Sequence, residues 1–428
     1  MNRIAFSVLR QVFFLFVLVS DLGFEGSLTS VRTLLVGLIG LSVLPFFYLY
    51  NKDFINTALR PPILYFCIFI FFGIVSTFFS EIPIKSFVYI FGYSTLTIFA
   101  ITLVNVFRLE MLLSILKFAI SLGIFISVVA HFLGIRDGYT YELGWGTTRF
   151  GGLYGQPNPM GAASAMYIII FISSFPKNIL ALPLLKSKSV ITALYSFYAC
   201  IYFKITFFMS LWTLWQSYSR SSLLGLTVSI TTLLFMEAVK EINKWGKIGR
   251  ILLVALILLL SLLSIFIIQG ISQENVQGLS RSGDEAELTT LTGRTVFWSY
   301  LLEKVAEKPL LGYGMGSVAA VAVEFGYEQW ATHAHNVYIE AAVYTGYLGA
   351  LTFVLFMISI LFKTAFFFLK GDDCLKPILA LVVFYSIVSF LEPVILGSAR
   401  NSLLIMLITS AYLSLSQGIR EGKIPSPP

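Results

Sequence analysis

The sequence has little charge, little cysteine and almost no histidine, and each shortage excludes a class of protein. Charged residues make up 12% of the 428 residues and hydrophobic residues 57%, so the chain has about half the charge of a typical soluble domain. Its three cysteines, Cys67, Cys200 and Cys374, are too few for a disulfide scaffold, and no Cys-x-x-Cys or metal-binding spacing occurs. With only three histidines, imidazole chemistry is confined to very few positions.

The net charge of +7 does not indicate a nucleic-acid-binding protein. The basic residues are spread over short segments between apolar runs, as the signals that orient membrane proteins are. The apolar runs are continuous and do not alternate, which argues against a membrane β-barrel.

Apolar runs of about 20 residues recur along the chain, and each is long enough to cross a bilayer as a helix. We therefore predict an all-α polytopic membrane protein with about twelve spans in a single transmembrane domain, residues 1–428. The first run has no Ala-x-Ala-like cleavage site after it and is read as a retained span. Lys204 lies inside the seventh span, where it must reach the interface or face protein. The predicted spans cover residues 4–20, 28–49, 61–79, 85–105, 112–134, 159–175, 189–211, 221–239, 250–270, 337–362, 375–391 and 400–416.

Lysine and arginine set the expected orientation. The loops on the side of the two termini carry 18 basic residues, mostly in short segments, and the opposite loops carry ten. By the positive-inside rule both termini are cytoplasmic. The long polar interval 271–335, between the ninth and tenth spans, then faces the other compartment, and the tail 418–428 is expected to be disordered.

The interval 271–335 holds most of the polar features that suggest chemistry. Thr292–Val305 has a helical pattern, with Val296, Leu301, Leu302 and Val305 on one expected apolar face. The run Pro309–Gly316 (PLLGYGMG) lacks the lysine of a phosphate-binding loop, so we interpret it as a flexible turn that lets the backbone approach a ligand or a helix.

His335 is the candidate general base, because a neutral imidazole can take a proton from a sugar hydroxyl near neutral pH. It is preceded by His333 and followed by Asn336, which either positions the histidine or caps the next helix. The alternative is an ordinary loop histidine at a helix start. A metal site is a weaker alternative, because His-x-His supplies only two ligands.

Two arginines are candidates for binding a diphosphate. Arg294 is near the predicted start of a helix, where backbone amides also favour anions. Arg220 lies in a very short turn on the side that the positive-inside rule leaves poor in cations. The plainer interpretations are a loop arginine and an interfacial anchor.

A second polar loop, 134–158, ends in the run Arg149–Asn158 (RFGGLYGQPN). Its aromatic residues can stack on sugars, although an interfacial aromatic belt is the commoner reason for such residues. Arg149 and Asn158 are candidate substrate contacts. Arg400 is a further candidate for a phosphate contact, with Glu392 as its alternative structural partner.

Taken together and in order, these motifs resemble the O-antigen ligase/polymerase family of bacterial membrane glycosyltransferases. The motifs are RFGGLYGQPN, Ser219-Arg220, Gly293–Trp298 (GRTVFW) with the glycine run, and His335-Asn336 with Gly346–Gly349 (GYLG). The resemblance covers most of the chain, and twelve spans with a major periplasmic loop between helices 9 and 10 agree with it.

The resemblance implies a GT-C-like fold in the bacterial inner membrane and a donor glycan carried on undecaprenyl pyrophosphate. It further implies that Arg220 and Arg294 engage the pyrophosphate and that His335 is the catalytic base. The implied reaction is inverting and needs neither metal nor cofactor.

Three functions remain open at this point. A ligase passes the glycan to lipid A-core, whereas a polymerase uses a second lipid-linked glycan as acceptor; we favour the ligase because one periplasmic loop dominates. A transporter of lipid-linked glycans is the alternative from another class, and it usually buries paired charges near mid-membrane. The sugars, the acceptor, the oligomeric state and the role of Lys204 are not specified by the sequence.

Overall fold

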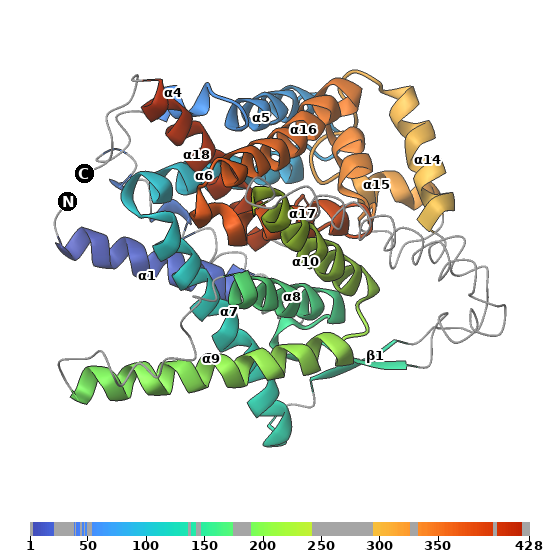
Figure 1. The fold of residues 1–428 in the computed structure, drawn as a ribbon. Coiled ribbons are helices and arrows are strands. Elements are labelled where there is room, and N and C mark those ends of the chain that lie inside the picture. Colours follow the sequence, from blue (N-terminus) through green and yellow to red (C-terminus); the bar gives the residue numbers. More distant parts are fainter. Residues whose placement is uncertain are drawn as a thin grey trace, which may run out of the picture.

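The computed structural model describes residues 3–20, parts of 38–48, and residues 54–135, 138–142, 147–173, 190–241, 294–325, 333–396 and 400–421 (Figure 1). Helices dominate these residues. The longer ones are α1 (Arg3–Ser20), α5 (Ile63–Thr77), α6 (Pro83–Val106), α7 (Leu109–Phe132), α8 (Pro157–Ser173), α9 (Val190–Gln216), α10 (Arg220–Glu241), α14 (Arg294–Glu307), α16 (Val337–Leu369), α17 (Lys376–Val388) and α18 (Arg400–Arg420). The shorter ones are α4 (Phe54–Ala58), η1 (Gly152–Tyr154), α15 (Val318–Ala322), η3 (Val323–Phe325) and η4 (Asp373–Leu375).

Ten of the twelve predicted spans coincide with helices of the structure. The predicted span 250–270 and most of 28–49 lie outside the described residues. Among the residues described, α6, α7, α10, α16 and α18 are long and apolar enough to cross a membrane. The predicted class, a multi-pass α-helical membrane protein, is confirmed to this extent, and the total of twelve spans stays a prediction.

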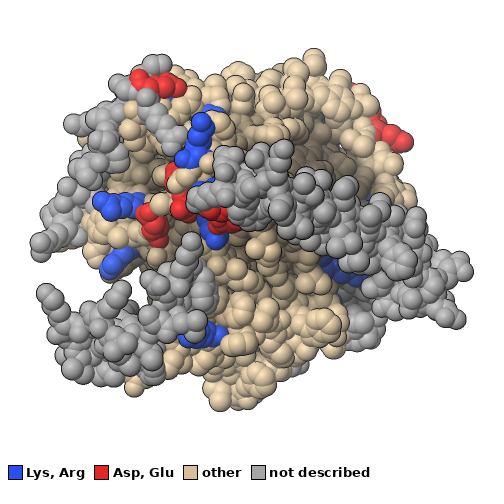
Figure 2. Space-filling model, in the orientation of Figure 1, with Lys and Arg blue, Asp and Glu red and all other residues tan. Residues whose placement is uncertain are grey.

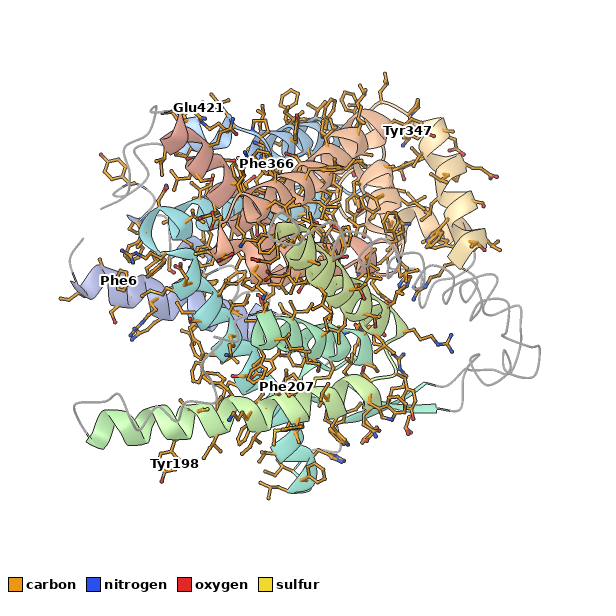
Figure 3. All side chains as sticks on the ribbon, in the orientation of Figure 1. Phe6, Tyr198, Phe207, Tyr347, Phe366 and Glu421 are labelled. Carbon is orange, nitrogen blue, oxygen red and sulfur yellow. The ribbon has the colours of Figure 1, made fainter. Side chains whose placement is uncertain are left out.

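The surface of the bundle has the character of a lipid-facing surface. Large apolar and aromatic side chains stand exposed along the helices, among them Tyr198 on α9 and Phe366 on α16, at 67% and 54% exposure. Figure 3 shows Tyr198 directed away from the bundle. In the view of Figure 2, most of the visible charged side chains gather on the left of the molecule, and most of the remaining described surface is uncharged. This distribution is what hydrocarbon requires of a protein surface.

Close helix packing in the centre depends on small residues. Gly225 of α10 lies against α17, where an added Cβ would come within 2.7 Å of a Val388 methyl group and 2.9 Å of the Phe384 ring. Ser229, one turn further along α10, donates a hydrogen bond to the carbonyl of Ala380. Small residues at such contacts let two helix backbones approach, which is how helices associate without a hydrophobic driving force.

The glycine run packs into a break in α16. Gly346 has φ 69° and ψ −176°, so the helix is interrupted there. The backbone N–H groups of Tyr313 and Gly314 donate to the carbonyls of Val343 and Tyr344 at 2.8 and 3.1 Å, and that of Tyr347 donates to Pro309 at 2.8 Å. The turn therefore satisfies backbone groups that the break would leave unpaired. The prediction that these glycines let the backbone approach a helix is confirmed.

Helix α14 covers the predicted helical pattern from Arg294 onward and ends two residues later than predicted, at Glu307; Thr292 lies outside the described residues. Its buried face consists of Phe297, Leu301 and Val305, spaced four residues apart, each at 1% exposure or less. Two members of the predicted face are wrong: Val296 and Leu302 are 57% and 43% exposed. A face with residues spaced four apart does not include Val296 or Leu302. The sequence pattern alone permitted this face or the one that was predicted.

Strands β1 (Tyr139–Glu142) and β2 (Thr147–Phe150) form an antiparallel hairpin that pairs Tyr139 with Phe150. The all-α prediction did not include this hairpin. Phe150 is fully buried, and its ring centroid lies 5.2 Å from that of Trp212 and 5.6 Å from that of His131. Phe150 therefore packs in the core and is not available to stack on a sugar.

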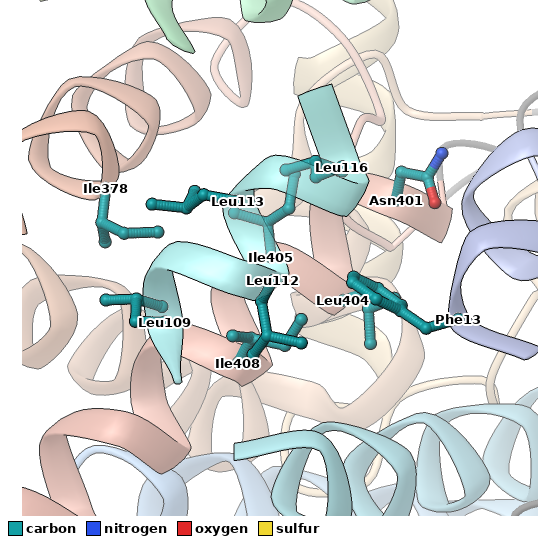
Figure 4. Close-up of a pocket in the computed structure, with 10 residues that line it drawn as sticks. All are labelled: Phe13, Leu109, Leu112, Leu113, Leu116, Ile378, Asn401, Leu404, Ile405 and Ile408. Atoms are coloured by element: carbon teal, nitrogen blue, oxygen red, sulfur yellow. The ribbon is translucent and has the colours of Figure 1, made fainter. Parts of the chain in front are cut away.

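A small cavity of about 10 Å³ lies among α1, α7, α17 and α18 (Figure 4). Its lining is apolar except for Asn401, whose side chain bonds to Ser20 and to the carbonyl of Val17. A space of this size holds at most one water molecule, so it is no substrate site.

Candidate active site

The candidate residues gather around one carboxylate, that of Glu392, in the segment between α17 and α18. Glu392 is 7% exposed. Its Oε1 accepts hydrogen bonds from Asn158 Nδ2 at 2.9 Å and from Arg294 Nη2 at 3.1 Å. Its Oε2 lies 3.6 Å from Nδ1 of His335. Segments more than two hundred residues apart in the sequence therefore meet at one side chain.

The charge balance at Glu392 favours the ionised carboxylate. Burial by itself raises the pKa of this carboxyl, because a low-dielectric environment disfavours the charged form. The contacts with His335 and the Arg294 guanidinium act in the opposite direction and are together stronger, so the pKa lies below its ordinary value of 4.5. Glu392 is thus a fixed negative charge facing an imidazole and a guanidinium.

His335 is held by its backbone neighbours on both sides. Its φ of 51° is in the left-handed region, which is costly for a residue with a Cβ and persists only where the surroundings impose it. The Ala334 carbonyl accepts a 2.7 Å hydrogen bond from the Trp298 indole of α14, and the Val337 N–H donates to Ser389 at the end of α17 at 2.9 Å. The imidazole is 23% exposed, so it is both positioned and accessible.

Asn336 is the N-cap of α16. Its Oδ1 accepts from the backbone N–H groups of Tyr338 and Ile339 at 3.0 and 3.1 Å, and its Nδ2 donates to the Phe390 carbonyl at 3.4 Å. The capping interpretation of Asn336 is confirmed, and the cap also joins α16 to the segment that carries Glu392.

Arg294 is the first residue of α14. Its Nη1 donates to the Leu391 carbonyl and its Nη2 to Glu392, and the side chain is 19% exposed. A guanidinium has five N–H donors in a planar fork, so these two contacts orient the group without using all of them.

Arg149 and Asn158 connect the cluster to the turn before α10. The Arg149 guanidinium donates from Nε to the Ser217 carbonyl at 2.8 Å and from Nη2 to Asn158 Oδ1 at 2.7 Å. Arg149 is only 3% exposed. Both residues were predicted to contact substrate, and the structure brings both into the cluster, with Arg149 turned toward protein.

Arg220 opens α10 three residues beyond Ser217 and is exposed. The intervening Ser219 bonds through its hydroxyl to Ser222 at 2.8 Å. Arg220 therefore lies at the end of the bundle that holds Arg149, Arg294 and His335, since α14 and α16 also begin there (Figure 1).

The other predicted positions are not tested. Arg400 begins α18, but its side chain lies outside the described residues, as does Thr292. The pairing of Arg400 with Glu392 stays a prediction.

A second histidine–carboxylate pair lies beside the first. His333 Nδ1 is 3.3 Å from Oε1 of Glu340, and the same oxygen accepts from the Tyr344 hydroxyl at 2.5 Å. The two histidines of His-x-His thus face different carboxylates. Among the residues that the structure describes, no three histidine, cysteine, aspartate or glutamate side chains are grouped as metal ligands would be.

Sequence reasoning missed the central position of Glu392, which it considered only as a partner for Arg400. The sequence did contain one indication: Glu392 is the only acidic residue between Asp373 and Glu421, in a segment that is otherwise mostly apolar. Glu340, in the first turn of an apolar helix, carries the same signal. An ionisable residue in such a segment is a functional candidate by default.

An apolar groove of about 440 Å³ lies between α7 and α9, near the ends of both helices that adjoin the hairpin. Its lining is entirely hydrophobic and includes Phe132, Phe208 and Trp212. Trp212 also contacts Phe150, the residue next to Arg149 in β2. The groove and the polar cluster are therefore separated by one strand of the hairpin.

The fold and the site together define a multi-pass α-helical membrane protein with a charged cluster at one end of its bundle. Residues 205–354, about a third of the chain, match the family model described as O-antigen ligase. The resemblance inferred from the motifs is confirmed. The match includes Arg220, Arg294, His335 and Asn336, and leaves Glu392 outside it. No curated protein matches the chain.

Proposed function

We propose that the protein is a glycosyltransferase that moves a glycan from undecaprenyl pyrophosphate to an acceptor sugar hydroxyl at the periplasmic membrane face. Ligation of O-antigen to lipid A-core is the favoured reaction. The observation that carries this proposal is the approach of His335 and Arg294 to one buried carboxylate, at 3.6 and 3.1 Å, with both residues inside the stretch that matches the O-antigen ligase family model. A base and a cation so close together can act on one substrate.

His335 is the proposed general base. Its Nδ1 faces Glu392, and a carboxylate there favours the tautomer with the proton on Nδ1. Nε2 then carries the lone pair and accepts the proton of the acceptor hydroxyl. The hydroxyl oxygen forms the new bond to the anomeric carbon as the bond from that carbon to the phosphate oxygen breaks, which inverts the configuration at that carbon.

Arg294 and Arg220 are proposed to stabilise the departing diphosphate. A guanidinium stays charged at any working pH and pairs bidentately with phosphate oxygens. Both residues stand at helix starts, Arg294 on α14 and Arg220 on α10, where backbone N–H groups favour an anion as well. The guanidinium and backbone N–H groups are thus already in position to stabilise the negative charge that develops on the leaving diphosphate.

The remaining features of the proposal concern the membrane. The donor is lipid-linked, and we place its tail against the apolar groove between α7 and α9, whose hydrophobic lining suits an isoprenoid chain. The orientation with cytoplasmic termini and an inner-membrane location puts the cluster at the periplasmic face. The reaction needs neither metal nor cofactor in this proposal.

Polymerisation is the second candidate, because the family comprises ligases and polymerases alike. We favour ligation because one outer loop, residues 271–335, dominates the sequence between the apolar runs. The transporter alternative is weaker, because the charges of the cluster stand at helix ends and not at mid-helix, where transporters pair them.

The test is transfer by the purified protein. It is incubated with undecaprenyl-pyrophosphate-linked glycan and either lipid A-core or a second lipid-linked glycan, with and without chelator. We expect product on lipid A-core, unchanged turnover with chelator, and a loss of at least about a hundredfold in His335→Ala. Transfer only to the lipid-linked glycan would replace ligation by polymerisation, and a strict metal requirement would overturn the metal-free mechanism.

Arg294→Ala and Arg220→Ala are expected to lose at least about a hundredfold in turnover as well, since each removes charge stabilisation from the leaving group. Lys308→Ala is the matched control. Lys308 is a cation of the same loop region, but it is partly exposed and pairs with Glu81 at 3.2 Å, away from the cluster. Wild-type activity in Arg294→Ala would remove that residue from the proposal.

A further inference from the structure

Two side chains, Arg149 and Asn158, link the turn before α10 to the segment that carries Glu392. The turn before α10 and the segment that carries Glu392 come from distant parts of the chain. Between them, Arg149 donates to the Ser217 carbonyl at 2.8 Å and to Asn158 at 2.7 Å, and Asn158 donates to Glu392 at 2.9 Å. Arg149 thus donates to Asn158, and Asn158 in turn donates to Glu392.

The link has the burial of a structural element and not of a binding surface. Arg149 is 3% exposed and Glu392 7%. The Arg149 guanidinium is directed at a backbone carbonyl and a neutral amide, so a phosphate oxygen would have to displace protein contacts to reach it. This arrangement argues against the substrate-contact role that sequence alone suggested for Arg149 and Asn158.

The guanidinium also decides which way the Asn158 amide points. A cationic donor at Oδ1 fixes that atom as the acceptor end, and this turns the Nδ2 donor toward Glu392. Oε1 of Glu392 then has two donors, from Asn158 and from Arg294, and the other oxygen, Oε2, is the one that faces His335.

We propose that Arg149 and Asn158 are positioning residues: they hold the Glu392 carboxylate so that it orients the His335 imidazole, and they tie this arrangement to the turn that carries Arg220. This inference rests on the proposed transferase function. It predicts that the link affects the rate of the chemical step and the protonation of His335, and leaves the binding of the donor almost unchanged.

The discriminating variant is Asn158→Asp. An aspartate keeps the acceptor for Arg149, so that contact survives, but it replaces the donor to Glu392 with a second carboxylate. The extra negative charge disturbs the position of Glu392 and stabilises the protonated imidazole. We expect kcat to fall about 10- to 100-fold, the acid limb of the kcat–pH profile to move up by about one pH unit, and KM for the donor to stay within about twofold of wild type.

The matched control is Gln156→Glu, the same amide-to-acid change two residues earlier, on an exposed side chain in the same turn. It is expected to leave kcat, KM and the pH profile unchanged, because solvent screens its charge. Asn158→Ala provides a second variant that adds no charge. It is expected to lower kcat without raising KM.

The outcomes separate this inference from the proposed function. If wild type transfers glycan and His335→Ala does not, the proposed function stands. If Asn158→Asp then has a raised KM with a normal kcat and an unmoved acid limb, Asn158 contacts substrate and the inference fails. Should Asn158→Asp not fold, a raised KM with normal kcat in Asn158→Ala contradicts the inference equally. If wild type shows no transfer, the proposed function itself fails.

Discussion

At the scale of the residue, the central feature is a carboxylate with more than one task. Glu392 neutralises Arg294, accepts from Asn158 and faces His335. A buried carboxylate is costly unless charge and hydrogen bonds compensate it, and here they do. The cluster therefore stabilises the junction of α14, α16 and the segment after α17.

The stability that Glu392 provides has a defined pH dependence. Its folded-state pKa is below 4.5, so the ionised form stabilises the fold above that pH, and the contribution is lost as the pH falls from about 4.5 through the folded pKa. We expect Glu392→Ala to cost about 3 kcal/mol near neutral pH, because it leaves the Arg294 charge without its partner. The cost should shrink in acid.

Thermal unfolding of wild type and Glu392→Ala in detergent, at about pH 7 and about pH 2.5, measures both quantities. Glu392→Gln is a neutral control, because it keeps the shape and an acceptor oxygen while removing the charge. Its stability should fall between those of wild type and Glu392→Ala. An equal difference in stability at both pH values would show that Glu392 is not an ion-pair partner in the fold.

Residue identities were predictable where one residue type is scarce. His335 stood out because imidazoles are rare in this chain. Arg294 stood out because it is near a predicted helix start, and Arg220 because the positive-inside rule disfavours a cation in its turn. The convergence on Glu392 was not predictable, because nothing in a linear pattern brings residue 158 next to residue 392. For the same reason the contacts of Arg149 with Ser217 and Asn158 could not be foreseen from the sequence.

At the scale of the element, the break in α16 is where the glycine run Pro309–Gly316 attaches to the bundle. Gly312 and Gly346 both have positive φ, and the backbones of the two segments come so close that side chains are excluded. The hydrogen bonds across this contact anchor the segment after α14, and α14 in turn holds the His335 loop through Trp298.

Gly346→Ala is expected to destabilise the protein by about 2 to 4 kcal/mol. A Cβ there would lie 2.5 Å from the Pro309 carbonyl oxygen, and φ is 69°. Gly92→Ala in α6 is the matched control, because nothing lies within 4 Å of its added Cβ. It should be neutral or slightly stabilising. Thermal unfolding in detergent compares the two, and equal midpoints would contradict the packing described for Gly346.

Helix positions were predictable from apolar length, because a bilayer demands about 20 apolar residues of each span. The buried face of α14 was not predictable, because its sequence permits more than one apolar stripe and only the neighbouring segments determine which one is buried. The hairpin β1–β2 was missed because four-residue strands bounded by glycine have no strong periodic signal.

At the scale of the whole molecule, the ends of the bundle differ. One end carries the cluster of Arg294, His335 and Glu392. The other carries ion pairs that join the end of α10 to the start of α17, Lys240 with Asp373 and Lys376 with Glu237, the latter at 2.7 Å. The positive-inside rule assigns the second end to the cytoplasm.

Single-cysteine labelling tests this orientation. In a background without the three native cysteines, Leu310→Cys lies in the polar interval that is expected to face the periplasm, and Lys370→Cys lies at the other end of α16; both residues are exposed. A membrane-impermeant maleimide added to cells with a permeable outer membrane is expected to label Leu310→Cys, and Lys370→Cys only after lysis. The reverse pattern would place the cluster in the cytoplasm and end the periplasmic proposal.

The central claim is that an imidazole at position 335, oriented by a carboxylate, removes the acceptor proton. The most direct measurement is the rate of glycan transfer by purified His335→Gly with imidazole added to the reaction. The account predicts an inactive variant whose activity returns in part and saturably with imidazole, in proportion to its neutral form. Full activity in His335→Gly without added imidazole would contradict it.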